Sequence, residues 1–447
     1  MLVEQEGPTQ HLYDFQRPHA LRLLRSLREE GVCLDASDTG TGKTYVALAL
    51  CSALGCERPL VVCPLSVVGS WRRAAKEVGL RDLRLAHYEM ICKKGRAWTG
   101  DHELERVFCT KRGVFTEPAP GVVVFDEAHR AKNKGTRPSR VVFAARDSGS
   151  RVVLVTSTAC DKQSALRNYG AVLRLFPESG FEAWLNEQEN PARSMHRALF
   201  PRFASRLRLS EVGQYLPRHT VVSKGVVLGE PREGSAYARL LKEEKPHVTH
   251  LREQIEHEKL PIFRDLVAKH LEAGKSVVVM LNFKRPLRLL ADMFLCPVVT
   301  GDQDPRERQQ LVADFQANRT RLLLLTLQTG GTGISLHDTA GGFPRVAIIS
   351  PPWSGQDLTQ ALGRTFRLGC RSEVVQYLVY CTDTFERRVC EVIREKLKNL
   401  ATVNEGASSR SVFHLVEEDV PKKRQREEED LLVEKLLLLE LKGGAVW

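Results

Sequence analysis

The sequence has no apolar run that approaches the roughly 20 residues of a membrane-spanning helix. It also lacks a secretory signal pattern at its N-terminus, and its 11 cysteines include no Cys-x-x-Cys pair. An odd cysteine count without such pairs argues against a disulfide framework and against a structural zinc site. We therefore expect a reduced intracellular protein without a membrane anchor.

The chain is long and basic. Its 447 residues leave room for two or three domains, and contents of 42% hydrophobic and 27% charged residues are typical of a globular protein. The 66 lysines and arginines exceed the 55 acidic residues, which gives a net charge of +11 and a pI near 9.1. This balance suggests a polyanionic partner without identifying it.

The segment LDASDTGTGKTYVALAL at residues 34–50 is typical of a phosphate-binding loop between a buried strand and a helix. Its glycines allow a tight turn that directs backbone amides, together with the helix dipole, toward an anion. A lysine would then reach the β- and γ-phosphates of a nucleotide, and a threonine hydroxyl would bind Mg²⁺. Ser37 occupies the position of the first glycine in the strict pattern, and its small side chain is compatible with the loop. The nucleotide-binding residues predicted in this loop are Gly40, Thr41, Gly42, Lys43 and Thr44.

A pair of acids follows a second buried strand. Residues 122–125 form an apolar run that ends in Asp126-Glu127-Ala128-His129. Asp126 is placed to hold Mg²⁺ through water, and Glu127 to orient and deprotonate an attacking water. Two adjacent acids can also simply cap a helix, but the glycine loop upstream favours the catalytic interpretation.

Two other features of the first half accompany these motifs. Apolar residues at helical spacing over 11–27 place Gln16 near the start of a helix. Its amide can read the adenine edge, although by itself such a residue is more typical of a helix surface. The strand pattern RVVLVTST at 151–158 ends in Thr156, Ser157 and Thr158, which could sense a γ-phosphate or be ordinary loop residues. Strands alternate with helical patterns from residue 30 to about 175, which predicts an α/β fold with a doubly wound parallel sheet.

The second half repeats this alternation. Prolines interrupt residues 176–250, which we interpret as a connector of short helices. Strands are then predicted at 276–281, 321–327 and 346–350, with helices at 266–272, 308–315 and 385–400. In QALGRTFRLG at 360–369, Arg364 and Arg367 are three residues apart and would share a helix face. They could form a salt-bridge patch or neutralise a transferring phosphoryl group.

In their order, these segments resemble the superfamily-two helicases and, within them, the Swi/Snf-type ATPases, across most of residues 10–400. The segments that carry the resemblance are FQRPHALRLL, DTGTGKT, VVCPLSVVGSW, YEM, VVVFDEAHRAKN, TSTA, VVVMLNF, ERQQLVADF, GGTGISL and QALGRTFRLG. In style the chain is similar to the Swi/Snf-like helicases of large DNA viruses and to compact annealing helicases. Two departures are TSTA in place of the usual Thr-Gly-Thr-Pro, and Gln328 where the family commonly has arginine.

The resemblance implies two RecA-like lobes with ATP and Mg²⁺ in the cleft between them. Lobe one would span residues 1–195, the connector 196–250, lobe two 251–410 and a tail 411–447. Gln16 would contact adenine, and Thr44 and Asp126 would hold Mg²⁺. The implied catalytic residues are Lys43, Asp126, Glu127, Gln360, Arg364 and Arg367, and the residues implied to couple the site to DNA are His129, Thr156, Ser157 and Thr158.

The resemblance also implies contacts to nucleic-acid phosphates, which are largely independent of base sequence. We expect movement along duplex DNA driven by ATP hydrolysis. The residues implied to make these contacts are Pro64, Ser66, Tyr88, Asn282, Thr326, Gly330 and Gly331. Two other functions stay open, namely a viral transcription-associated NTPase or RNA helicase, and a DNA-binding scaffold that does not hydrolyse ATP.

The end of the chain differs in composition from the rest. A basic cluster at 421–426 resembles a nuclear-localisation signal, which predicts a nuclear or viral-factory location, although a solvated basic tail has the same pattern. The leucine-rich segment from Leu431 to Leu441 could bind a protein partner or pack on lobe two.

Overall fold

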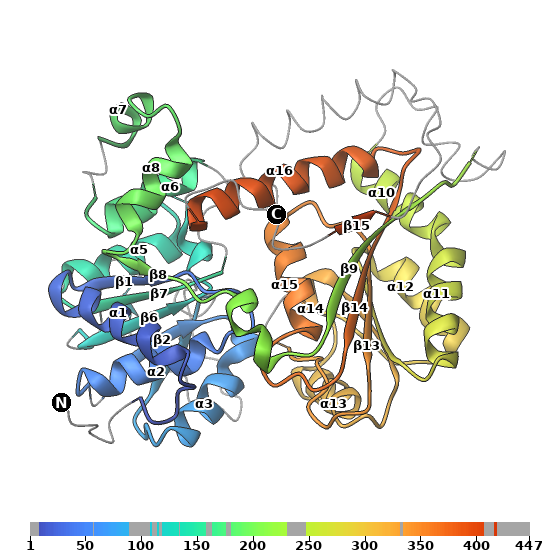
Figure 1. The fold of residues 1–447 in the computed structure, drawn as a ribbon, viewed down its shortest axis with the longest axis horizontal. Coiled ribbons are helices and arrows are strands. Elements are labelled where there is room, and N and C mark those ends of the chain that lie inside the picture. The colour runs from blue at the N-terminus through green and yellow to red at the C-terminus, as the bar shows by residue number, and fades with distance from the viewer. Residues whose placement is uncertain are drawn as a thin grey trace. The chain divides into compact units, whose positions relative to one another are not determined.

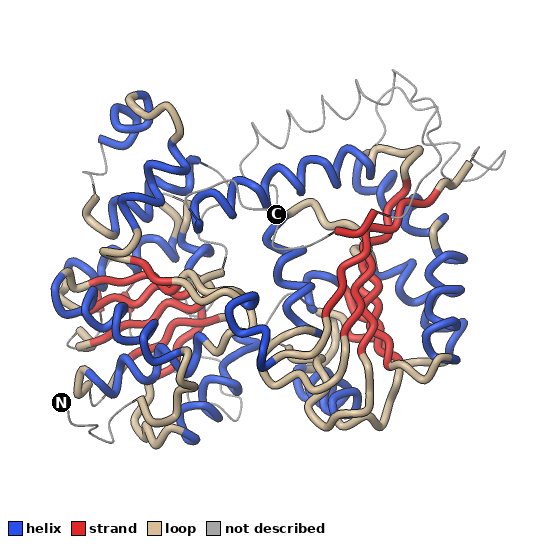
Figure 2. Tube along the Cα trace, in the orientation of Figure 1, coloured by secondary structure: helices blue, strands red, loops and turns tan. Residues whose placement is uncertain are grey.

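The computed structural model describes residues 9–56, 58–88, 108–109, 114–115, 119–133, 135–157, 163–175, 180–229, 247–330, 334–405 and 415–417. The chain divides into two compact units, and the second unit begins after Tyr215. The part of the last long helix that begins at Lys396 belongs to the first unit. Each unit is built on one parallel sheet with helices on both faces (Figures 1 and 2). The predicted α/β class with two doubly wound parallel sheets is therefore confirmed.

The sheet of the first unit has six strands in the order β3-β2-β6-β7-β1-β8, all paired in parallel. Its strands are β1 (Val32–Asp35), β2 (Leu60–Cys63), β3 (Arg84–His87), β6 (Val122–Asp126), β7 (Arg151–Val155) and β8 (Ala204–Ser205). A separate antiparallel pair consists of β4 (Phe108–Cys109) and β5 (Val114–Phe115). The helices are α1 (Gln16–Glu29), α2 (Lys43–Ala53), α3 (Val68–Glu77), α5 (Arg137–Asp147), α6 (Gln163–Val172), α7 (Phe181–Asn186) and α8 (Pro191–Leu199), with short 3-10 turns η1 (Leu65–Val67), η2 (Ala128–Ala131) and η4 (Leu209–Tyr215).

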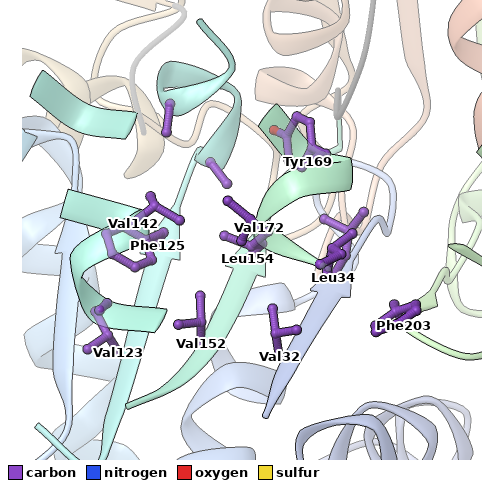
Figure 3. Close-up of a cluster of buried hydrophobic side chains, with 14 of the residues drawn as sticks. Val32, Leu34, Val123, Phe125, Val142, Val152, Leu154, Tyr169, Val172 and Phe203 are labelled. Atoms are coloured by element: carbon purple, nitrogen blue, oxygen red, sulfur yellow. The ribbon is translucent and has the colours of Figure 1, made fainter. Parts of the chain in front are cut away.

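Alternate residues of these strands face two different hydrophobic cores, because side chains along a strand alternate between the faces of its sheet. Val123, Phe125, Val152 and Leu154 pack with α5, α6 and α8 on one face (Figure 3). The intervening strand residues pack with α1, α2 and α3 on the other face. Burial on both faces explains why the strands are nearly continuous apolar runs.

The sheet of the second unit has seven strands in the order β11-β12-β10-β13-β14-β9-β15, again all parallel. Its strands are β9 (His219–Val226), β10 (Ser276–Leu281), β11 (Val298–Val299), β12 (Leu322–Thr326), β13 (Arg345–Ile349), β14 (Val374–Cys381) and β15 (Leu415–Glu417). Its helices are α10 (Val248–Glu258), α11 (Leu260–Glu272), α12 (Lys284–Phe294), α13 (Pro305–Gln316), α14 (Leu327–Gly330), α15 (Gly355–Thr365) and the part of α16 (Glu386–Glu405) that precedes Lys396.

The segment expected to be a connector, 196–250, is divided between the two sheets. Its β8 pairs with β1 at the edge of the first sheet, and its β9 pairs with β14 over eight residues in the second. The prolines led to the expectation of irregular structure, yet Pro217 stands just before β9, where proline interrupts no pairing. In the tail, Leu415–Glu417 pairs with β9, whereas the basic cluster at 421–426 and the segment from Leu431 to Leu441 lie outside the described residues.

A buried ion pair joins three parts of the second unit. Lys259, between α10 and α11, is fully buried, and its Nζ donates to Glu386 Oε1 at 2.7 Å and Oε2 at 2.9 Å. The same ammonium donates to Ser350 Oγ at 3.0 Å, and Glu386 also accepts from the Cys381 amide at 2.9 Å. The interaction therefore ties α11, the end of β13 and the start of α16 together.

Lys259→Ala is expected to lower the free energy of unfolding by about 3–5 kcal/mol, because it leaves the Glu386 carboxylate buried without its cation. Urea denaturation of the full chain measures this change. The control is Lys284→Ala, which removes an exposed pair to Asp302 at 2.6 Å and should lower the free energy of unfolding far less. Equal losses in the two variants would contradict the prediction.

Candidate nucleotide site

The sheet register brings the predicted motifs of the first unit to one edge. Val155, at the end of β7, pairs with Asp35 at the end of β1 and with Asp126 at the end of β6. Because the strands are parallel, their carboxyl ends meet at the edge where α/β sheets bind ligands. The glycine loop after β1, the acid pair at the end of β6 and the hydroxyl residues after β7 therefore lie side by side.

The glycine loop has the backbone that its sequence predicts. Gly40 and Gly42 adopt left-handed conformations with φ of 87° and 85°, which glycine adopts without strain. Gly42 directly precedes α2, so the loop ends at a helix N-terminus that favours an anion. Lys43 Nζ donates to the carbonyls of Ser37 and Asp38, both at 2.9 Å. Burial lowers the pKa of Lys43, while the charges of Asp35, Glu127 and Asp126 oppose this shift.

The acid pair is held by hydrogen bonds on both oxygens of Asp126. Trp71 Nε1 donates to Asp126 Oδ2 at 2.8 Å, and the Glu127 amide donates to Oδ1 at 2.9 Å. Burial, assisted by the neighbouring Glu127 carboxylate, raises the pKa of Asp126 to about 6, although the Trp71 hydrogen bond and Lys43 oppose the shift. A nearby cation such as Mg²⁺ would favour the charged carboxylate.

Glu127 has a strained backbone. Its φ of 52° lies in the left-handed region, which non-glycine residues rarely adopt and which is enriched at functional sites. His129 Nδ1 lies 3.2 Å from Glu127 Oε2 and 3.2 Å from Thr156 Oγ1. One imidazole nitrogen therefore links the predicted water-activating acid to the end of β7. Ser157 and Thr158 are also predicted to couple the site to DNA. Ser157 Oγ lies 2.9 Å from Thr39 Oγ1 in the glycine loop, and Thr158 lies outside the described residues.

Gln16 has a different environment from the helix surface that its pattern suggests. Its side chain is buried, with Nε2 donating to the Thr41 carbonyl at 2.8 Å and Oε1 accepting from the Tyr13 amide at 3.0 Å. Both ends of the amide are therefore bonded within the chain. In this conformation Gln16 fixes the glycine loop, and contact with adenine would require exchange of these hydrogen bonds.

The sequence does not predict the buried polar network that lies beneath the glycine loop. His19 is fully buried; its Nε2 lies 3.2 Å from Asp35 Oδ1 and from Ser37 Oγ, and its Nδ1 lies 2.8 Å from Ser205 Oγ. Burial raises the pKa of Asp35, but His19, Lys43 and the hydrogen bond from Ser37 together outweigh this effect, and the net pKa is lowered. Ser37 Oγ also accepts from the Leu207 amide at 2.9 Å, so the serine that replaces a glycine ties the loop to the segment after β8. The one available signal was the spacing of His19 from Gln16 on the buried face of α1.

The residues predicted to contact nucleic acid differ in exposure. Ser66 is exposed in η1, the turn that follows the buried Pro64. Tyr88 is 3% exposed and donates its hydroxyl to the Asp126 carbonyl at 2.9 Å, so the expected phosphate contact does not fit its position.

The predicted contacts of the second unit are also internal. Asn282 Nδ2 donates to Glu256 Oε1 at 2.9 Å and to the Pro351 carbonyl at 3.1 Å. Thr326 is buried and donates to Thr329 Oγ1 at 2.8 Å. Gly330 ends α14, and Gly331 lies outside the described residues.

The predicted catalytic residues of the second unit do not all lie on one helix. Gln360 and Arg364 are buried on α15, but this helix ends at Thr365. Phe366 is extended, so the shared helix face expected for Arg364 and Arg367 is wrong. Instead, both side chains contact one neighbouring segment, since Arg364 Nη1 donates to the Ile334 carbonyl at 3.4 Å and Arg367 Nη1 to Ser335 Oγ at 2.6 Å.

Side chains from two strands hold the end of α15. Gln376 Nε2 donates to the Leu362 carbonyl and to Thr365 Oγ1, both at 2.7 Å. The ring of His219 stacks on Phe366 with centroids 4.0 Å apart, and its Nε2 lies 2.9 Å from Gln376 Oε1. These contacts hold the chain where α15 ends, two residues before Arg367.

Two parallel α/β units, with a glycine loop, a lysine and an acid pair gathered at the edge of the first sheet, define a helicase-like ATPase. The family model described as "Helicase conserved C-terminal domain" matches residues 258–369. A protein of Acanthamoeba polyphaga mimivirus, named provisionally as an ATP-dependent RNA helicase, is 28% identical over 88% of this chain and 84% of its own length. The human SWI/SNF-related matrix-associated actin-dependent regulator of chromatin subfamily A member 1 is 24% identical over 87% of this chain but only 43% of its own length.

Among solved structures, the Sulfolobus solfataricus SWI2/SNF2 ATPase core in complex with dsDNA aligns with a TM-score of 0.40 and 17% identity, over 93% of this chain and 100% of that chain. The family match and the sequence relatives confirm the resemblance to superfamily-two helicases of the Swi/Snf type. These likenesses indicate that the chain is a nucleic-acid-dependent ATPase. In the described part of the chain, no helix has the length and apolar character needed to cross a membrane.

Proposed function

We propose that the chain hydrolyses ATP in the first unit and uses the reaction to move along nucleic acid, with duplex DNA as the preferred track. The observation that carries this proposal is the convergence of the glycine loop, Lys43 and the acid pair at one edge of the first sheet. The donor set suits a magnesium nucleotide, because it combines a helix N-terminus and an ammonium with two carboxylates.

In this proposal, Gly40, Thr41 and Gly42 shape the loop that holds the phosphates. Lys43 exchanges its two carbonyl partners for phosphate oxygens, and Thr44 and Asp126 hold the metal. Magnesium ATP, when bound, supplies the phosphoryl group and a cation that neutralises its charge. Glu127 orients a water and accepts its proton, and His129 fixes the Glu127 carboxylate. The roles of Gln360, Arg364 and Arg367 as catalytic residues are proposed from their motif.

Binding to nucleic acid is supported by the net charge of +11, and the preference for duplex DNA by the relatives named as chromatin factors. The name of the mimivirus relative instead favours a viral RNA helicase, which we keep as the second candidate. A nuclear or viral-factory location and a protein partner for Leu431 to Leu441 stay predictions from the sequence.

Steady-state ATP hydrolysis with duplex DNA, single-stranded DNA, RNA or no nucleic acid tests the proposal. We expect the largest stimulation with duplex DNA, and we expect the nucleic-acid concentration for half-maximal stimulation to rise steeply between 50 and 200 mM salt, on the order of tenfold or more, because phosphate contacts release counterions. Stronger stimulation by RNA would favour the second candidate. A folded protein that binds ATP and never hydrolyses it would indicate a scaffold and contradict the proposal.

A further inference from the structure

Three adjacent strands of the first sheet place two aromatic residues beside Asp126. The order β3-β2-β6 makes these strands neighbours, and the register pairs Cys63 with His87 and Val62 with Phe125. The carboxyl ends of the three strands are therefore level. Tyr88 follows β3 directly, and Trp71 lies on α3, which follows β2 and the short turn η1.

Both aromatic residues direct their polar atom to Asp126. Trp71 is 1% exposed and donates Nε1 to Asp126 Oδ2 at 2.8 Å. Tyr88 is 3% exposed and donates its hydroxyl to the Asp126 carbonyl at 2.9 Å. Buried tryptophan and tyrosine generally find a partner for their polar atom, so one such bond alone would mean little. Here both partners belong to the same residue, the one proposed to hold the metal.

The two hydrogen bonds constrain Asp126 in complementary ways. With the Glu127 amide on Oδ1 and Trp71 on Oδ2, the plane of the carboxylate is fixed. Tyr88 fixes the backbone of the same residue, and the Arg130 guanidinium lies over the Tyr88 ring at 5.8 Å from its centroid. Outer partners that orient a metal-holding carboxylate commonly control metal affinity.

Trp71 is also close in the chain to a surface turn. Ser66 is exposed in η1, and α3 begins two residues later at Val68. Trp71 is therefore in the first turn of a helix whose N-terminus emerges from that turn. A phosphate that binds at Ser66 and shifts the start of α3 would move the Trp71 donor relative to Asp126.

We propose that Trp71 and Tyr88 are positioning residues that hold the Asp126 carboxylate for Mg²⁺, and that Trp71 transmits nucleic-acid binding at the turn around Ser66 to this carboxylate. The proposal rests on the proposed function for the identity of the bound metal and nucleotide. It assigns a role at the nucleotide site to two residues from segments that were predicted to contact nucleic acid.

Trp71→Phe tests the proposal because it removes the N–H donor and keeps an aromatic ring in the core. Mg²⁺ should raise the affinity of the protein for ADP. We expect the variant to need about 10-fold more Mg²⁺ than the wild type to reach half of this increase. Its affinity for ADP in EDTA, without metal, should be unchanged. Fluorescent ADP binding, titrated with Mg²⁺, measures this and requires no turnover. The matched control is Trp184→Phe on α7, which should behave as the wild type.

Tyr88→Phe removes a single oxygen. We expect it also to need more Mg²⁺ for half of the increase in ADP affinity, but by a smaller factor than Trp71→Phe. For Trp71→Phe we also expect a several-fold lower ratio of nucleic-acid-stimulated to basal hydrolysis, whereas Tyr88→Phe should lower both rates together. Wild-type Mg²⁺ dependence in both variants, with unchanged thermal unfolding, would overturn the proposal. Failure of the wild type to hydrolyse ATP would instead refute the proposed function, while the ADP titration would still decide the role of Trp71.

Discussion

Replacement of Lys43 by alanine is expected to reduce ATP hydrolysis by about 10³-fold, because it removes the ammonium that stabilises charge on the transferring phosphoryl group. Lys43 stands at the first position of α2, where the helix N-terminus and the ammonium would act on the same phosphate oxygens. Among the described residues, its side chain donates hydrogen bonds to the Ser37 and Asp38 carbonyls, which are local to the loop. The substitution should therefore impair chemistry far more than folding.

The measurement is steady-state hydrolysis at saturating ATP and nucleic acid, accompanied by thermal unfolding. Lys76→Ala, on the exposed side of α3, removes the same charge from the same unit and should leave hydrolysis near the wild-type rate. If Lys43→Ala retained the wild-type rate, the assignment of the glycine loop as the phosphate site would be wrong.

The parts of the fold that could be predicted from the sequence are those determined by short-range patterns. The strands at 122–125 and 276–281 are apolar runs because both faces of their sheets are covered, and the structure has β6 and β10 at these positions. The loop at Gly40 and Gly42 was equally recognisable, since its conformation depends on the residues that form it. Because the strands are parallel and in register, such loops then lie at the same edge of the sheet.

What could not be predicted depends on partners distant in the chain. His19 is fixed by Ser205, which lies 186 residues later, and β9 pairs with β14, whose Gln376 is 157 residues after His219. Nothing local indicates such pairings, so the segment at 196–250 read as a connector. Tyr88 and Thr326 illustrate the same limit, because a motif places a residue at a strand end while tertiary packing decides whether its side chain is exposed.

Glu127→Gln is expected to separate binding from hydrolysis. Hydrolysis should fall by about 10²- to 10⁴-fold, since an amide cannot accept the proton of the attacking water. The substitution keeps the size of the side chain, and it does not alter the Glu127 amide that donates to Asp126 Oδ1. The left-handed φ of 52° is imposed on either residue, so folding should be little affected.

Metal binding should be retained or strengthened in this variant. The Glu127 carboxylate is one of the causes that raise the pKa of Asp126 to about 6, and its removal brings that pKa down. A larger fraction of Asp126 is then charged at neutral pH, which favours Mg²⁺. We therefore expect magnesium-dependent ATP binding at wild-type affinity or tighter. Under single-turnover conditions, hydrolysis of the bound ATP should be lost. A joint loss of ATP binding and hydrolysis would show that Glu127 supports the structure of the site and would argue against its role as the general base.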